Sequence, residues 1–186
     1  SITIGPDTFQ FVRQPDGTFE PPAGSTMELT EVSGNYRLKQ RLGNTIHFED
    51  TQDSEDDGQR VQKIVDVDGK EMTFAYHSDD RIDYVEDAYG RRYTFRYNSN
   101  NQTTTLTDST GRSIGFRYDS EGNQDRYTDP EGKFTYYVYE ASTDPDGATP
   151  VDPSGTEASE HLMVRIRNHD KEIVAQNIWD TLGRVK

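Results

Sequence analysis

Apolar and polar side chains alternate along much of this chain, and the alternation recurs. In residues 91–97, Tyr93, Phe95 and Tyr97 occupy every second position, and Arg or Thr side chains fill the positions between them. A period of two residues is typical of a β-strand with one buried and one solvated face. Residues 70–76 and 112–118 show the same pattern, so the sequence predicts a series of short strands with an aromatic inner face.

The strands belong to a repeat of 21 residues, which four kinds of position mark. An Asp is followed by a Gly three residues later, and two aromatic residues follow that Gly at offsets of five and seven. The structural repeat positions are Asp66, Gly69, Phe74 and Tyr76; Asp87, Gly90, Phe95 and Tyr97; Asp108, Gly111, Phe116 and Tyr118; and Asp129, Gly132, Tyr137 and Tyr139. Such a unit cannot bury its apolar face alone. The predicted fold class is therefore all-β, with repetitive antiparallel β-hairpins stacked as an extended, twisted sheet or solenoid.

The regularity of the repeat divides the chain into four segments. Residues 1–42 are predicted to be lead-in strands, and residues 43–140 the regular repeats, with an acidic insertion at residues 49–57. Residues 141–160 are rich in Pro, Asp and Gly, which predicts an exposed loop. Residues 161–186 resume the strand pattern as a further, truncated repeat, so we expect the parent protein to be longer. In residues 134–139 both faces are apolar, and we expect other parts of the chain to cover them.

Composition restricts the partners. The chain has 186 residues, of which 30% are hydrophobic, and its formal net charge is −14 at pH 7. Regular aromatic positions in a chain of low hydrophobicity favour thin sheets with large wet surfaces. A strongly acidic surface disfavours nucleic acid, and no apolar run is long enough for membrane insertion. Cysteine is absent, which excludes disulfides and cysteine-based catalysis.

No classical catalytic motif is present, so the sequence does not predict an enzyme and offers no catalytic residue. Neither His-Glu-x-x-His nor Gly-x-Ser-x-Gly occurs, and the repeating Asp positions favour turn caps over a glycosidase pair. No cofactor is predicted. Calcium is a weaker alternative, for which the candidate ligands are Asp66, Asp68, Asp144 and Asp146, without a complete calcium-loop motif.

Two aromatic residues are candidates for facing a ligand, namely Tyr136 and Trp179. Rings of this kind bind sugars, and a repeat array can multiply weak contacts. The competing interpretation is that neighbouring repeats cover both rings.

These motifs resemble the YD-repeat, or Rhs-repeat, family, whose units end a strand with Tyr-Asp before a Gly-containing turn. Tyr118-Asp119 with Gly122 and Trp179-Asp180 with Gly183 are the best matches, and residues 107–118 look like an almost unaltered unit. Residues 15–24 look like the segment that leads into the repeats of bacterial Rhs proteins. The literal Tyr-Asp pair is lost at three repeats, where His, Asn or Glu follows the Tyr. The family's self-cleavage motif contains Asp-Pro-x-Gly, which residues 129–132 and 152–155 match, but we interpret both as turns.

The resemblance implies a β-sheet ribbon that spirals into a hollow shell, as in Rhs toxins, Tc toxin cocoons and teneurins. The chain would be a non-catalytic segment of such a wall, in a large protein that is secreted or at the cell surface, of bacterial origin. The implied partners are the remaining repeats of the parent chain, with either an enclosed effector domain or surface glycans. A carbohydrate-binding or adhesive module is one alternative, and a calcium-stabilised scaffold or filament is another.

Overall fold

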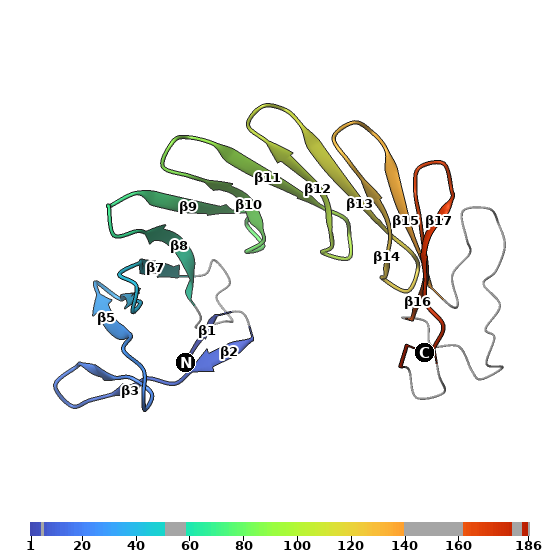
Figure 1. Ribbon diagram of the computed structural model, residues 1–186. Helices are drawn as coiled ribbons and strands as arrows, with labels where there is room; N and C mark the ends of the chain where they lie inside the picture. Colours follow the sequence, from blue (N-terminus) through green and yellow to red (C-terminus); the bar gives the residue numbers. More distant parts are fainter. Residues whose placement is uncertain (5, 51–58, 140–161, 180–183, 186) are drawn as a thin grey trace. The chain divides into compact units, whose positions relative to one another are not determined.

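The computed structural model describes residues 1–4, 6–50, 59–139, 162–179 and 184–185. Within these ranges all helices and strands assigned are β-strands, and their pairings are antiparallel. The predicted fold class is confirmed, because antiparallel hairpins follow one another along an open sheet (Figure 1). The described part of the chain contains no helix with the length and apolarity to cross a membrane.

The strands are β1 (Ile2–Ile4), β2 (Asp7–Phe9), β3 (Val12–Arg13), β4 (Phe19–Glu20), β5 (Glu28–Val32), β6 (Asn35–Lys39), β7 (Thr45–Asp50), β8 (Gln59–Val65), β9 (Glu71–Tyr76), β10 (Ile82–Glu86), β11 (Arg92–Tyr97), β12 (Thr103–Asp108), β13 (Ser113–Tyr118), β14 (Gln124–Thr128), β15 (Phe134–Tyr139), β16 (Met163–Arg167) and β17 (Ile173–Gln176). Strands β5 to β17 form one 13-stranded sheet in sequence order. Two small sheets, β1 with β2 and β3 with β4, precede it.

The chain divides into two compact units, residues 1–94 and 95–186. The first unit has a core of three buried side chains, Leu29, Leu38 and Ile46, of which Leu38 is 0% exposed. The lead-in strands contribute to it, since Ile2, Ile4 and Phe19 pack against these residues. The core therefore lies where the lead-in strands meet the first hairpins.

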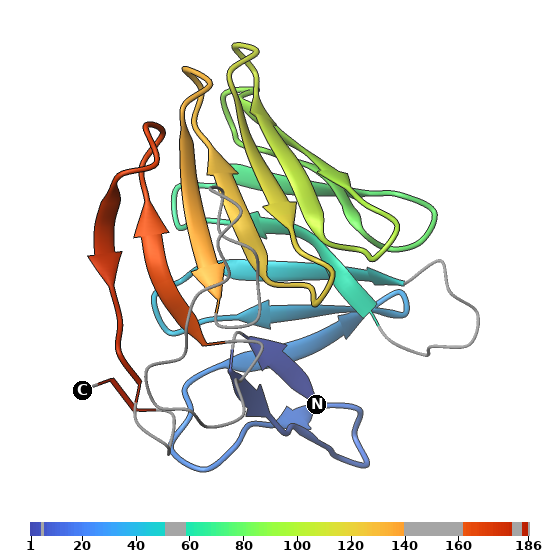
Figure 2. The same ribbon diagram turned by 90° about the vertical axis from the view of Figure 1, so that its right-hand side faces the viewer.

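The second unit consists of hairpins that lie next to one another, yellow to red in Figure 2. Its buried apolar side chains are Val138, which is 1% exposed, and Val164. Strand β16 pairs along β15, and the ring of His169 lies 5.2 Å from that of Phe134. The chain after the predicted loop thus contributes to covering the doubly apolar strand.

One type of turn closes the hairpins at both ends of the strands. In the turn of residues 108–112, the Asp108 N–H donates to the Arg112 carbonyl at 2.9 Å, and the Gly111 N–H donates to the Asp108 carbonyl at 3.0 Å. The fourth residue has a positive φ, which is 89° at Gly111, so the loop is a tight turn followed by a left-handed residue. The left-handed residues from residue 69 to residue 132 are Gly69, Asp80, Gly90, Asn101, Gly111, Gly122 and Gly132. Their intervals alternate between 11 and 10 residues, so the 21-residue period contains two similar half-units.

The longer half-unit contains a β-bulge. Ile82 pairs with Tyr76 and Tyr84 with Ala75, which leaves Asp83 as an extra residue in β10. Asp125 is the corresponding extra residue in β14, 42 residues later, and Gln62 takes that position in β8, 21 residues earlier. A bulge disrupts the local ladder and increases strand twist. The repeat therefore introduces the same twist at regular intervals.

Candidate functional site

The four repeat aspartates lie at the first positions of turns. Asp66, Asp87, Asp108 and Asp129 each accept hydrogen bonds through Oδ1 from the backbone N–H groups two and four residues later, at 2.8 to 3.0 Å. In two of them the other oxygen also accepts a bond, from Arg91 Nε to Asp87 at 2.7 Å and from Arg112 Nε to Asp108 at 2.8 Å. These carboxylates act within their own turns, as caps that satisfy backbone donors.

The same hydrogen bonds set the electrostatics of the turn. The Thr110 hydroxyl, with further donors from Arg112, lowers the pKa of Asp108 below its usual range. The Arg91 side chain lowers the pKa of Asp87 in the same way. A carboxylate held in its charged form by donors is a poor general acid near neutral pH. The arrangement favours turn stabilisation over acid catalysis.

The repeat tyrosines close the ends of hairpins. The ladder between β12 and β13 stops at the pair Thr105 and Gly115, although both strands continue. There the Tyr118 hydroxyl donates to the Thr103 carbonyl at 2.8 Å. The same bond joins Tyr76 to the Val61 carbonyl at 2.5 Å and Tyr139 to the Gln124 carbonyl at 3.1 Å. Since each acceptor lies 15 residues before its donor, this bond is a property of the repeat.

Burial keeps these hydroxyls protonated. Desolvation raises the pKa of Tyr76 and of Tyr139 above the ordinary value, so both remain donors at neutral and mildly basic pH. The Arg60 guanidinium lies over the Tyr76 ring, 4.2 Å from its centroid. Tyr97, at the equivalent repeat position, is half-buried. The aromatic face therefore provides hydrogen bonds as well as apolar contact.

The other aromatic repeat positions pack across strands. Phe74 pairs with Val85, Phe116 with Tyr127, and Tyr137 with Ile166, and the rings of Phe116 and Tyr127 are 6.0 Å apart. Phe95 is half-buried. Aromatic and β-branched pairs of this kind stabilise sheets. The repeat glycines Gly69, Gly90, Gly111 and Gly132 take the left-handed turn position described above.

The two candidate ligand-facing aromatics are half-buried. Trp179 donates its indole N–H to the Met163 carbonyl at 3.0 Å, beside the extra residue Val164 of β16, which is the role that tyrosine plays in the regular units. Tyr136 pairs in register with Arg126 and Arg167, and its ring lies 5.9 Å from that of Phe134. Contacts within the sheet thus engage both side chains.

The candidate calcium ligands do not converge among the residues described. Asp66 accepts bonds from its own turn, and Asp68 lies exposed in that turn. Asp144 and Asp146 lie outside the described residues, as do residues 51–58 of the acidic insertion and the predicted loop at 141–160. In the described ranges, no group of three or more His, Asp or Glu side chains is arranged to hold a metal ion.

The two Asp-Pro-x-Gly matches have different outcomes. Residues 129–132 form the ordinary repeat turn, in which Asp129 accepts from the Glu131 and Lys133 N–H groups. Residues 152–155 lie outside the described residues.

Sequence reasoning missed the second turn of each unit and the carbonyl that each tyrosine caps. Asn98 and Asp119 cap their turns just as the repeat aspartates do, with N–H···O distances of 2.9 to 3.0 Å. The signal was the spacing of Asp or Asn at alternating intervals of 11 and 10 residues.

A family comparison matches the regular part of the chain. Residues 97–133 match the RHS Repeat family, which confirms the resemblance inferred from the motifs. The matched range contains the Tyr118-Asp119 pair and the turn glycines from Gly111 to Gly132.

Curated relatives are similar over a short stretch. Over 75 residues the chain is 28% identical to the tRNA nuclease WapA of Bacillus subtilis and 29% identical to the tRNA3(Ser)-specific nuclease WapA of Bacillus spizizenii. The matches cover 40% of this chain and 3% of each relative. This chain therefore corresponds to a small part of those proteins.

Solved structures are similar over most of this chain. A TcdB2–TccC3–Cdc42 crystal structure matches 90% of the chain at 12% identity, with a TM-score of 0.49. A Tc holotoxin pore of Photorhabdus luminescens, with a mutation in TccC3, matches 90% at 13% identity and the same TM-score. In each case the match covers 9% of the solved chain.

Proposed function

Because this chain carries an RHS repeat at residues 97–133, we propose that it is a non-catalytic structural segment of a large bacterial protein, secreted or at the cell surface. The segment forms part of a β-shell that encapsulates or scaffolds another part of the parent. Its partners are the remaining repeats and either an enclosed effector domain or surface glycans.

The observation that carries the proposal is the regular propagation of the sheet. From β5 to β17 each strand pairs with its neighbours in sequence, and the same capped turn and the same tyrosine-to-carbonyl bond recur along it. The groups that could perform chemistry, the repeat carboxylates and tyrosines, are used to build the hairpins. Such a unit adds length to a wall without adding a reaction centre.

The end of the sheet supports an extended array. Strand β17 is the last strand of the sheet in the described residues, and its Ile173 and Val174 side chains are 49% and 61% exposed. Exposed apolar side chains on an edge strand favour pairing with another strand. Under the proposal, a further repeat of the parent covers this edge.

The names of the WapA relatives describe nucleases, but the matched stretch covers only 3% of each relative. Under the proposal, this stretch is wall in those proteins too, and their catalytic groups lie elsewhere. The same division in the parent of this chain would place any effector outside these 186 residues.

Protease protection of the parent protein tests the shell. In the full-length protein, Tyr118→Phe combined with Gly111→Val should weaken the wall, because both changes remove features that hold one hairpin together. Limited proteolysis should then cleave a segment that stays intact in the matched control, Tyr93→Phe, at an exposed ring. Equal cleavage of both proteins would argue against encapsulation.

One observation favours the carbohydrate-binding alternative. A shallow hollow of about 290 Å³ in the first unit is lined by Ile64, Met72, Tyr89 and polar groups that include Asp66 and Lys70. Tyr89 is 69% exposed, and an open ring beside carboxylates is typical of sugar sites. Binding of a neutral glycan that Tyr89→Ala abolishes would favour the adhesive function over a purely structural one.

The calcium-stabilised scaffold or filament remains a separate alternative. Its candidate ligands Asp144 and Asp146 lie outside the described residues, so its support is the acidic composition of the chain. Removal of calcium tests it, as argued at the scale of the whole molecule below.

A further inference from the structure

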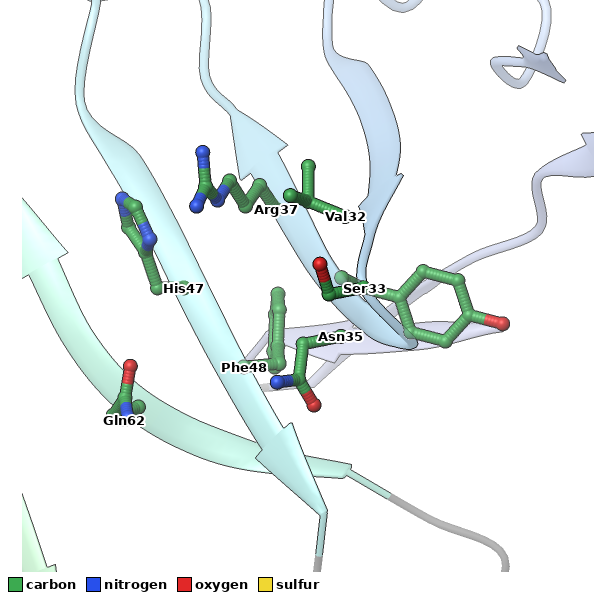
Figure 3. A pocket seen from close by; sticks show the side chains of 8 residues that line it. Val32, Ser33, Asn35, Arg37, His47, Phe48 and Gln62 are labelled. Carbon is green, nitrogen blue, oxygen red and sulfur yellow. The ribbon is translucent and has the colours of Figure 1, made fainter.

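A polar pocket of about 190 Å³ lies on the first unit, and the structural role does not use it (Figure 3). Strands β6, β7 and β8 and the turn between β5 and β6 supply its walls. The lining residues are Val32, Ser33, Asn35, Tyr36, Arg37, His47, Phe48 and Gln62. Figure 3 shows Arg37, His47 and Gln62 on three consecutive strands. Arg37 and His47 alternate with the buried Leu38 and Ile46, so they lie on the sheet face opposite the core.

The rim of the pocket is fixed before any ligand arrives. Ser33 and Gly34 form the turn between β5 and β6, with φ of 55° and 86°. Gln59, two strands away in β8, donates its amide to the Gly34 carbonyl at 2.7 Å and accepts from the Tyr36 N–H at 3.0 Å. Two hydrogen bonds from one side chain tie this turn to β8 across β7, and preorganisation of this kind reduces the ordering cost of binding.

Positive charge collects along the pocket. Arg37, His47 and Lys63 are successive register partners across β6, β7 and β8, so they share one face. Lys63 is paired with Glu71 at 2.8 Å. No described carboxylate forms an ion pair with the Arg37 guanidinium. Three cationic positions in a row, with one paired carboxylate, are unusual in a chain of net charge −14.

The histidine reports this environment. Burial lowers the pKa of His47, and Arg37 and Lys63 lower it further, while Glu71 raises it. These three are the charged neighbours that act on the imidazole in the described structure. An anion in the pocket would offset the two cations and favour the protonated imidazole.

We propose that the pocket formed by Arg37, His47, Asn35 and Gln62 binds a small oxyanion, either a phosphate or the carboxylate of a sugar acid. The Arg37 guanidinium can donate two parallel hydrogen bonds to either group. The amides of Asn35 and Gln62 and the His47 imidazole supply further donors. A volume of about 190 Å³ holds several waters, and so a group of phosphate or uronate size. The ligand class lies beyond the structural role and does not depend on it.

The test is an NMR titration of His47 in the complete 186-residue chain, with inorganic phosphate in one series and glucuronate in the other. Binding should give saturable shifts at His47 and raise its pKa, while the His77 and His169 signals stay unchanged. Arg37→Gln should weaken binding at least ten-fold. The matched control, Arg96→Gln, removes another exposed arginine and should bind as the wild type does.

The two series distinguish the sources of the oxyanion. A response to phosphate alone assigns a phosphate ligand, a response to glucuronate alone assigns a sugar acid, and a response to both supports general oxyanion recognition. The proposal is overturned if neither anion shifts His47 at tens of millimolar, or if Arg37→Gln binds as tightly as Arg96→Gln. Circular dichroism of both variants establishes that the sheet is retained.

Discussion

At the scale of single residues, the hydroxyl groups of the repeat tyrosines contribute to stability through one defined bond each. Tyr118→Phe removes the donor to the Thr103 carbonyl and keeps the ring in place. We expect a loss of about 1 kcal/mol in the free energy of unfolding, because a half-buried carbonyl loses its partner. Chemical denaturation measures the difference. Tyr93→Phe is the control, since Tyr93 is 52% exposed, and an equal loss in both variants would contradict the assigned role.

Asp108 should give the stability of the chain a dependence on pH. Its donors lower its pKa in the folded state below the unfolded value, which is about 3.9. Its contribution is therefore complete above that unfolded value and is lost as pH falls through the lower folded one. Asp108→Asn keeps an oxygen for the two backbone N–H groups, as Asn98 does, but cannot titrate.

Melting temperatures measured from pH 7 to pH 2 distinguish the two proteins. The wild type should be the more stable one near neutral pH, and the difference should close at the acidic end of the range. A difference that stays constant over the whole range would show that the charge of Asp108 contributes nothing.

At the scale of the elements, the turn tolerates a residue according to its ease in the left-handed conformation. Gly111→Ala meets no atom within 4 Å, so the cost is conformational and should be about 1 kcal/mol. Gly111→Asn should cost less, because Asn101 takes this conformation in another turn of the chain, with φ of 62°. Unfolding by urea measures both variants, and an Asn variant as unstable as the Ala variant would refute this explanation.

The sequence predicted the hairpins because period-two patterning and regular glycines are strong local signals. It did not reveal that Asn98 opens the same turn as Asp108, because Asn101 stands where the other turn has Gly111. The partner of the Tyr118 hydroxyl was also out of reach, because it is a backbone carbonyl freed where the ladder stops. Backbone acceptors leave no mark on side-chain patterns.

The candidate ligand residues were predicted by type, and their environment comes only from the fold. The indole N–H of Trp179 is bonded to Met163, 16 residues earlier, and no pattern of aromatic spacing announces that bond. Arg37 and His47 are ten residues apart in the chain and were not singled out. Strand pairing brings them into one pocket.

At the scale of the whole molecule, the carboxylates that the structure describes act as turn caps, which need no metal. We expect a chelator to leave the melting temperature unchanged, since Asp66 and its counterparts accept backbone N–H groups. Differential scanning calorimetry with and without EDTA measures this. A lower melting temperature after chelation, restored by added calcium, would favour the calcium-stabilised scaffold instead.

The central claim is that the chain is built from interchangeable 21-residue units. Deletion of residues 98–118 removes one period and joins Tyr97 to Asp119, whose turn is equivalent to that of Asn98. Deletion of residues 98–107 removes only a half-unit, so strands of the same kind become neighbours and the tyrosine-to-carbonyl bond at Tyr118 loses its acceptor strand.

The most direct measurement is cooperative thermal unfolding of these two deletion proteins beside the complete chain, followed by circular dichroism. The account predicts that the full-period deletion unfolds cooperatively, with a β-sheet spectrum, and that the half-period deletion is markedly less stable. Equal destabilisation of both proteins would contradict the account, because the 21-residue unit would then not be the structural step of the wall.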